Sequence, residues 1–215
     1  MSILDSATVA QVPWGDDTVQ VIGLAPGTRL YRIYRHDNMD WEAPPEQFRH
    51  GRLDPPDGCK SEFATLYTAE SPLTGAFEAR ALRMDATLTG ERLTIIEDTD
   101  PGLPPRRIVA HLVASGVMFL NLEDRMTARA FNLDPDAVID RPAMWRRAMK
   151  SIVDRLNEDP PRTIAPIAGV AHQSKIRGSN GWNFGLLMPK HTEVLVRGSS
   201  TILDLNALLK VESLR

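Results

Sequence analysis

The stretch FATLYTAESPLTGAFEA, residues 63–79, indicates a strand that passes directly into a helix. FATLYTA carries the β-branched and aromatic residues that strands favour. Ser71 is a good helix N-cap, and Pro72 suits the first helical position. An apolar stripe at helical spacing follows at Leu73, Phe77, Ala81 and Met84. The pattern predicts a helix that carries Glu78 in its second turn, beside this stripe.

An earlier strand is predicted in LYRIY, residues 30–34. Its alternation places Leu30, Arg32 and Tyr34 on one face and the residues between them on the other. Arg32 therefore shares a face with apolar neighbours. Residues 36–62 are rich in Pro, Gly, Asp and Glu, which is typical of a loop. A loop of this length is more often a binding loop than a plain connection.

The rest of the chain alternates between strand and helix signals. Strands are expected at 92–97, 106–114 and 117–122, followed by a short helix at 122–131. The clearest helix begins after Asp140, with Pro142 near its start and Pro160 beyond its end. Its expected buried face consists of Trp145, Met149, Ile152, Val153 and Leu156. Further strands are expected at 167–172, 182–188, 192–198 and 202–205, ending in a short helix.

These elements predict the α+β class, with one domain of mixed sheets and packed helices. A chain of 215 residues has the length of one such domain. Residues 1–29 mix polar and apolar residues around several prolines and glycines, so an N-terminal arm is expected there. The domain itself is expected over residues 30–215.

Bulk properties exclude several classes of protein. The formal net charge is −3 and the pI is about 6.0, so no whole-molecule field draws the chain to nucleic acid or to an anionic membrane. The longest apolar stretch, residues 108–122, is shorter than the roughly 20 residues of a membrane span. The first residues lack the features of a signal peptide, so the cytoplasm is the expected location. Cys59 is the single cysteine, which excludes an internal disulfide and a cysteine-rich zinc site.

Motifs exclude further classes. The sequence has no GxGxxG, no P-loop pattern and no HExxH, so nothing in it indicates a Rossmann dinucleotide-binding domain, a P-loop nucleotide-binding protein or a zincin metalloprotease. The five histidines show no ligand spacing, so no metal is expected. His172 lies two residues before Ser174, but residues two apart on a strand are not placed for proton transfer, and no GxSxG elbow exists. A serine hydrolase is therefore rejected.

Two arginines are candidates for binding phosphate. A guanidinium beside a strand, as at Arg32, can clamp a pyrophosphate or a ribose bidentately. From periodicity alone, a surface or ion-paired arginine is the more frequent explanation. Arg52, in HGRLDPP at residues 50–56, is the second candidate.

Four further side chains have both a chemical and an ordinary explanation. Tyr67, at the end of its strand, can stack on a planar ring of a ligand or be a half-buried strand residue. Tyr31 adjoins Arg32 and is a further substrate-binding candidate. Glu78 on pattern alone is a solvated helix residue, but a carboxylate can also stabilise positive charge that develops in a transition state. Ser174 is either a turn serine or a donor to a ribose or an amide.

Taken together, three fragments resemble the RES domain, a family named for its Arg, Glu and Ser. The fragments are LYRIYR at 30–35, GRLDPP with LYTAESPLTGAFEA within 51–79, and GVAHQSK at 169–175. The resemblance covers roughly residues 28–190. RES proteins are mostly toxins of bacterial toxin–antitoxin pairs, with a fold related to ADP-ribosyltransferases and an attack on NAD+. The chain departs from the family around Arg52, where His50 and Leu53 stand in place of a second glycine and a tryptophan.

The resemblance implies an enzyme that breaks the nicotinamide–ribose bond of NAD+, its substrate, with no separate cofactor. Arg32 and Arg52 would hold phosphate or ribose, Tyr67 would stack, and Glu78 would stabilise the transition state. Ser174 would orient the substrate. The acceptor of the ADP-ribosyl group stays open among water, inorganic phosphate and a protein side chain. These give a hydrolase, a phosphorylase and an ADP-ribosyltransferase.

The resemblance also implies partners. An antitoxin with a helix-turn-helix DNA-binding part would cover the active site, and any contact with DNA would be indirect, through this partner. A homodimer follows from the same analogy. A rival interpretation is a non-catalytic binding module on the same fold, which the altered residues around Arg52 favour.

Overall fold

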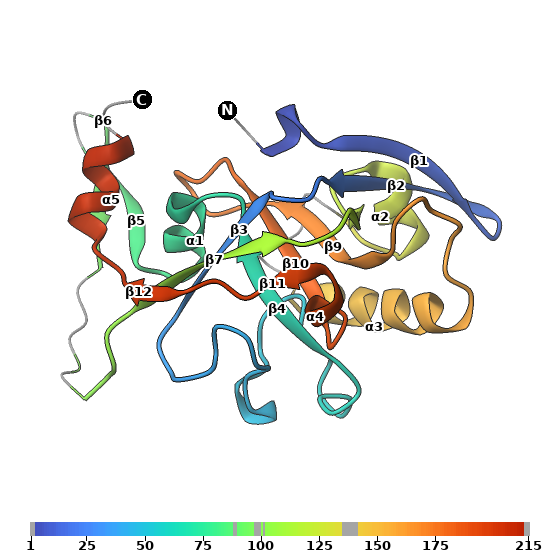
Figure 1. Ribbon diagram of the computed structural model, residues 1–215, viewed down its shortest axis with the longest axis horizontal. Coiled ribbons are helices and arrows are strands. Elements are labelled where there is room, and N and C mark those ends of the chain that lie inside the picture. Colours follow the sequence, from blue (N-terminus) through green and yellow to red (C-terminus); the bar gives the residue numbers. More distant parts are fainter. Residues whose placement is uncertain (1–2, 88–89, 97–99, 101, 135–141, 213–215) are drawn as a thin grey trace.

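A large mixed sheet forms the centre of the computed structural model, which describes residues 3–87, 90–96, 100, 102–134 and 142–212 (Figure 1). The ten strands of this sheet are β1 (Thr8–Trp14), β2 (Asp17–Leu24), β3 (Arg29–Tyr34), β4 (Ala64–Ala69), β7 (Arg107–Val113), β8 (Val117–Asn121), β9 (Ile167–Gln173), β10 (Trp182–Met188), β11 (Leu195–Val196) and β12 (Ser200–Ile202). Their order is β1-β2-β8-β9-β10-β4-β3-β7-β11, and β12 also pairs with β7. A separate hairpin consists of β5 (Leu82–Thr87) and β6 (Gly90–Ile95).

Five α-helices accompany the sheet in the described part of the chain: α1 (Pro72–Glu78), α2 (Arg125–Ala130), α3 (Pro142–Glu158), α4 (His191–Val194) and α5 (Leu205–Glu212). Short 3-10 turns lie at Ile3–Asp5 and Glu46–Phe48. Strands β8 and β9 pair in parallel, and α2 and α3 lie in the long connection that a parallel pair needs. The other pairings of the described strands are antiparallel.

Residues 8–24 differ from the expected N-terminal arm, because they form the hairpin β1–β2 at the edge of the main sheet. Gly15, with φ of 59°, supplies the tight turn of this hairpin. Trp14 is almost fully buried, and its Nε1 donates to the carbonyl of Asp159 at 2.5 Å. The guanidinium of Arg155 covers the Trp14 ring at 4.6 Å. Contacts between Trp14 and the end of α3 therefore stabilise the hairpin β1–β2, although the prolines and glycines of this segment predict a loop.

Helix α1 begins as the sequence predicts but ends earlier. The Ser71 hydroxyl accepts a hydrogen bond from the Thr74 backbone N–H at 3.1 Å, which confirms the N-cap. The prediction that Ala81 and Met84 continue the helix is wrong. Arg80 takes a left-handed backbone conformation with φ of 51°, and β5 begins two residues later. Glu78 is thus the last helical residue.

The C-terminal part also differs in detail. The strand expected at 192–198 is helix α4 followed by the two-residue β11. Of the strand expected at 202–205, only Ile202 belongs to a strand, as the last residue of β12, and Leu205 is the first residue of α5. His191 and Val194, three residues apart, are the buried side of α4. The expected Glu97 end of β6 and the Asp140 start of α3 lie outside the described residues.

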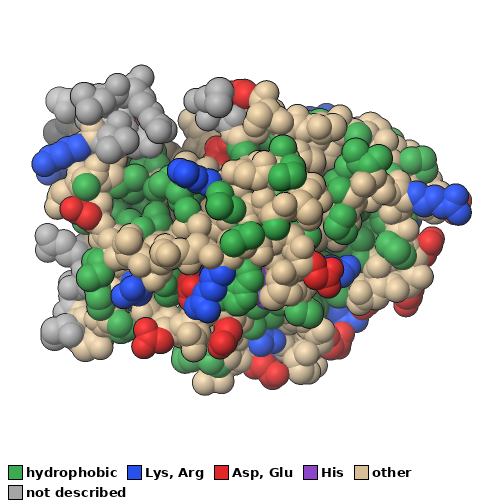
Figure 2. Space-filling model, viewed as in Figure 1, with side chains coloured by type: hydrophobic (Ala, Val, Ile, Leu, Met, Phe, Trp, Pro, Cys, Tyr) green, Lys and Arg blue, Asp and Glu red, His purple; other side chains and the backbone are tan. Residues whose placement is uncertain are grey.

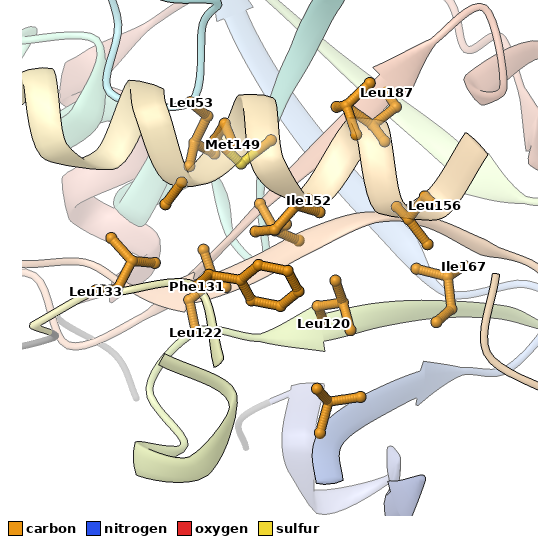
Figure 3. Packing of buried hydrophobic residues seen from close by; sticks show 14 of the residues in the cluster. Leu53, Leu120, Leu122, Phe131, Leu133, Met149, Ile152, Leu156, Ile167 and Leu187 are labelled. Atoms are coloured by element: carbon orange, nitrogen blue, oxygen red, sulfur yellow. The ribbon is translucent and has the colours of Figure 1, made fainter. Parts of the chain in front are cut away.

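The core on one face of the sheet lies beneath α3. Its residues Trp145, Met149, Ile152, Val153 and Leu156 are buried, as predicted from their spacing. Figure 3 shows Met149, Ile152 and Leu156 above Leu120, Leu122 and Ile167. The burial of an apolar face is the main stabilising contribution of such a helix.

The opposite face holds a second cluster, to which strands from both ends of the sheet contribute. It includes Ile22 of β2, Leu30 of β3, Phe119 of β8, Phe184 of β10 and Leu195 of β11. The sheet therefore curls around this cluster. A third cluster joins α1, the hairpin β5–β6 and α5 at one end of the molecule, on the left in Figure 1.

The chain is a single mixed α+β domain, which confirms the predicted class. On the face drawn in Figure 2, basic and acidic side chains are interspersed, in line with the small net charge. Within the described residues, none of the helices has the length and apolar character to cross a membrane.

Candidate active site

A cavity of about 650 Å³ lies where β3 and β4 diverge. The two strands pair only at Tyr31 and Ala69, among their described residues. Beyond that point β3 continues along β7 and β4 along β10. The lining includes five of the six residues singled out in the sequence: Tyr31, Arg32, Arg52, Tyr67 and Glu78.

Arg32 is held in the gap between the two strands. Its Nε donates to the carbonyl of Met39 at 2.6 Å, and its Nη1 donates to the carbonyl of Tyr67 at 3.0 Å. Burial lowers the pKa of Arg32 to about 10, so the guanidinium stays charged at neutral pH. These two bonds use two of the five N–H donors and fix the plane of the group. The arginine is thus a rigid, buried cation at the cavity wall.

Arg52 lies on a loop that β4 anchors. The backbone N–H of Leu53 donates to the Tyr67 hydroxyl at 2.8 Å, and the Thr65 hydroxyl donates to the Leu53 carbonyl at 2.8 Å. The Leu53 side chain is fully buried beneath α3. Gly51 is required, because a Cβ there would overlap the Tyr67 hydroxyl. The loop therefore has a defined conformation despite the unusual residue at 53.

The carboxylate of Glu78 accepts hydrogen bonds from three side chains of the site. Its Oε2 accepts from Arg52 Nη2 at 3.0 Å. Its Oε1 accepts from the Ser174 hydroxyl at 2.8 Å and from Asn183 Nδ2 at 2.8 Å. Three donors from three separate segments thus orient one carboxylate at the cavity wall.

Ser174 lies behind Glu78 and is not among the described residues that line the cavity. It is almost fully buried, and its backbone N–H donates to the Gly181 carbonyl at 2.8 Å. The serine therefore contacts the carboxylate directly and supports its orientation.

Asn183 lines the cavity and was missed in the sequence. It is 5% exposed and sits on β10 opposite His172 of β9. The available signal was a single amide inside the otherwise apolar strand WNFGLLM. A buried polar side chain needs a partner, and here the partner is Glu78.

Tyr67 directs its hydroxyl at the Arg52 loop. Burial raises the pKa of Tyr67 well above its usual value, so the phenol stays neutral. Asp54 follows Leu53 in this loop, and its Oδ2 accepts from the Gly51 N–H at 2.7 Å. Burial also raises the pKa of Asp54. Tyr67 thus supports the loop, and it is also one of the residues that line the cavity.

His172 is buried and neutral. Its Nδ1 lies 2.9 Å from the Gln173 carbonyl, and its ring meets Trp145 edge-on at 5.5 Å. Burial, and next the charge of Arg52, lower the pKa of His172 to about 3. The hydroxyl of Ser174 donates to Glu78, so no Ser–His pair exists here.

The cavity is electropositive. Beside Arg32 and Arg52, its lining includes Arg80, Lys175 and Arg177, whereas Glu78 is the single acid among its described lining residues. Outside the cavity, Lys175 pairs with Glu123 at 2.6 Å, and Arg177 pairs with Glu91 at 2.5 Å. Such a wall suits a ligand with several phosphate oxygens.

The described residues contain no group of three His, Cys, Asp or Glu side chains that could hold a metal ion. The chemistry that the side chains offer is electrostatic: anion binding by arginines next to one oriented carboxylate.

Comparison with known proteins returned no match: no family model, no curated protein and no solved structure is similar to this chain.

Proposed function

We propose that the protein binds NAD+ in the electropositive cavity and cleaves its nicotinamide–ribose bond, as the resemblance to the RES domain implies. One observation carries the proposal: Arg52, Ser174 and Asn183 converge on Glu78 at the wall of a cavity rich in arginine. A pyrophosphate needs cations, and a developing oxocarbenium ion needs an anion nearby. The cavity offers both.

In the reaction, the bond between ribose C1′ and the nicotinamide nitrogen breaks, and its electron pair leaves with nicotinamide. The positive charge of the pyridinium moves to the ribose, where Glu78 stabilises it. With water as acceptor, the new C1′–O bond gives ADP-ribose and releases one proton. Inorganic phosphate or a protein side chain in place of water gives phosphorolysis or ADP-ribosylation.

The named residues then divide into three roles. Arg32 and Arg52 bind phosphate or ribose, and Arg52 exchanges its contact with Glu78 for one with the substrate. Tyr67 and Tyr31 line the cavity, and Tyr67 stacks on a ring of the substrate. Ser174 acts by positioning the carboxylate, and Asn183 joins it in this role.

The biological part of the proposal rests on the same resemblance. The protein acts as a toxin that depletes cytoplasmic NAD+, a separately encoded helix-turn-helix antitoxin blocks the cavity, and two copies form a homodimer. The fold is of the type related to ADP-ribosyltransferases, and the mixed sheet with diverging central strands is compatible with this.

A binding-only module is the second candidate, and the ion pair between Arg52 and Glu78 favours it, because it occupies two groups that catalysis needs. Nicotinamide release from NAD+ by the purified protein, with and without phosphate, tests both. Release above the spontaneous rate supports the enzyme. Calorimetric binding of NAD+ without release supports the binding module.

A further inference from the structure

The turn that joins α1 to β5 forms part of the wall of the cavity (Figure 1). Glu78 is the last residue of the helix, Ala79 and Arg80 follow it, and all three line the cavity. Arg80 is exposed to solvent. The candidate carboxylate and a basic residue therefore lie two positions apart in the same cavity wall.

Helix α1 ends in a turn that usually contains glycine. The backbone N–H of Ala81 donates to the Ala76 carbonyl at 2.8 Å, and that of Arg80 donates to the Phe77 carbonyl at 3.0 Å. This pair of bonds is the Schellman motif, which needs a left-handed residue just after the helix. Arg80 takes this position with φ of 51°. Glycine adopts the conformation readily, whereas a Cβ makes it unfavourable.

Helix α2 offers a comparison within the same molecule. The N–H of Leu133 donates to the Ala128 carbonyl at 2.8 Å, that of Asn132 donates to the Arg129 carbonyl at 3.1 Å, and Asn132 has φ of 54°. Asparagine is the usual alternative to glycine in this motif. Asn132 is not among the described residues that line the cavity. The unfavourable residue thus stands at the cavity wall, and residues in unfavourable backbone conformations cluster at active sites and ligand clamps.

Arg80 also differs from the other basic side chains of the cavity in its bonds. The other four each form a hydrogen bond or an ion pair with the protein: Arg32, Arg52, Lys175 and Arg177. No hydrogen bond or ion pair joins the Arg80 side chain to any described residue. A phosphate can therefore bind Arg80 without displacing an existing contact, whereas it reaches Arg52 only by replacing Glu78.

We infer that Arg80 is a further substrate-binding residue, which contacts a phosphate group at the wall of the cavity. This role accounts for an arginine at a position that suits glycine. A guanidinium binds phosphate oxygens through paired N–H donors. The inference rests on the proposed function, in which the phosphate belongs either to the dinucleotide or to inorganic phosphate as the acceptor.

Two variants at residue 80 test the inference by calorimetric titration with inorganic pyrophosphate, which is independent of turnover. Arg80→Gly removes the guanidinium and relieves the backbone conformation. It should weaken pyrophosphate binding by about tenfold or more, while the melting temperature rises by up to about 4 °C. Arg80→Gln keeps the Cβ and removes the charge, and it should weaken binding to the same extent without the rise in melting temperature.

Two control variants lie on α2, outside the described lining of the cavity. Asn132→Gly changes the matching turn residue and should leave pyrophosphate binding unchanged. Arg129→Gln removes an equal charge from an exposed position. It should change affinity by less than about twofold, because solvent and salt screen charges at a distance.

Substrates with and without phosphate identify the source of the phosphate. If Arg80 contacts the dinucleotide, Arg80→Gln should lower kcat/KM for NAD+ by about tenfold or more. Nicotinamide release from nicotinamide riboside, which has no phosphate, should then stay within about twofold of the wild type. If Arg80 contacts the acceptor, the variant should instead raise the concentration of inorganic phosphate needed for half-maximal release.

The possible failures are distinguishable. Equal pyrophosphate affinity of the wild type, Arg80→Gly and Arg80→Gln would overturn the inference while NAD+ cleavage stands. A lower melting temperature of Arg80→Gly with unchanged binding would likewise overturn it and leave Arg80 a structural residue at the end of α1. Weaker pyrophosphate binding by both variants, without nicotinamide release by the wild type, would overturn the proposed function and keep Arg80 as a phosphate-binding residue.

Discussion

Replacing Glu78 with glutamine separates charge from shape at the candidate site. The glutamine carbonyl can still accept from Ser174 and Asn183, which bond the Oε1 position. Its amide group then faces Arg52 in place of the carboxylate oxygen that lies 3.0 Å away. The two paired side chains are 18% and 24% exposed. Solvent screening at this exposure limits the lost ion pair to about 1 kcal/mol of folding free energy. The melting temperature should therefore fall by only about 2–4 °C.

The rate should fall much further than the stability. Removing one preorganised group that stabilises transition-state charge typically lowers kcat about a hundredfold or more. Affinity for NAD+ should change much less, because the positive charge on the ribose develops only as the bond breaks. Chromatographic measurement of nicotinamide at saturating NAD+ gives kcat, and calorimetry gives affinity. Glu193→Gln, an exposed glutamate on α4, is the matched control.

Nicotinamide release within a few-fold of the wild-type rate would refute the role of Glu78. A large drop in melting temperature would instead mean that the substitution disturbs the fold. Asn183→Ala then serves as the second variant, because it removes one of the two bonds to Oε1 and keeps the negative charge. It should lower kcat more than it raises KM, and unchanged kinetics would remove Asn183 from the site.

Four further perturbations test other parts of the structure. Arg32→Ala should weaken NAD+ binding measured by calorimetry and lower the free energy of unfolding by about 1–3 kcal/mol, because the carbonyls of Met39 and Tyr67 lose their donor; unchanged affinity would exclude Arg32 from binding. Leu53→Ala should lower the free energy of unfolding in urea by about 2–5 kcal/mol, since this side chain is fully buried beneath α3, and a cost below 1 kcal/mol would contradict the described anchoring of its loop. The folded-state pKa of His172, about 3, lies below its ordinary value of 6.5, so the unfolded state binds more protons between these pH values. The free energy of unfolding should therefore fall as the pH drops from 6.5 to 3. His172→Gln should reduce the slope of unfolding free energy against pH by up to about 1.4 kcal/mol per pH unit. Expression of the wild type should lower cellular NAD+ and stop growth, whereas the Glu78→Gln protein at equal level should do neither; arrest at constant NAD+ would favour modification of a protein target.

Several elements follow from local sequence alone because their signals are short-range. Ser71 starts α1 by accepting a hydrogen bond from the N–H of Thr74, three residues away, and Pro72 supplies the backbone angle of the first helical position. The buried face of α3 follows from the helical spacing of Trp145 through Leu156. The alternation in residues 30–34 likewise predicts β3 and the burial of Arg32 on its apolar side.

Other features depend on partners that are distant in sequence. The local sequence of β1–β2 predicts a loop, but contacts of Trp14 with Asp159 and Arg155 at the end of α3 stabilise a hairpin there. Helix α1 ends at Glu78 because the chain turns at Arg80 to form β5, although Ala81 and Met84 keep the helical spacing. In both places tertiary packing outweighs the local pattern.

The sequence by itself determined the fold class and the main strands and helices, and it identified Arg32, Arg52, Glu78 and Ser174 as candidate site residues. Only the tertiary structure decided that Arg52, Ser174 and Asn183, which lie 26, 96 and 105 residues from Glu78, bond one carboxylate. It also decided that Ser174 stands behind Glu78 and that Arg80 lines the same cavity as Glu78. The physical reason is that local patterns fix backbone conformation, whereas the meeting of side chains depends on how the curled sheet brings its strands together.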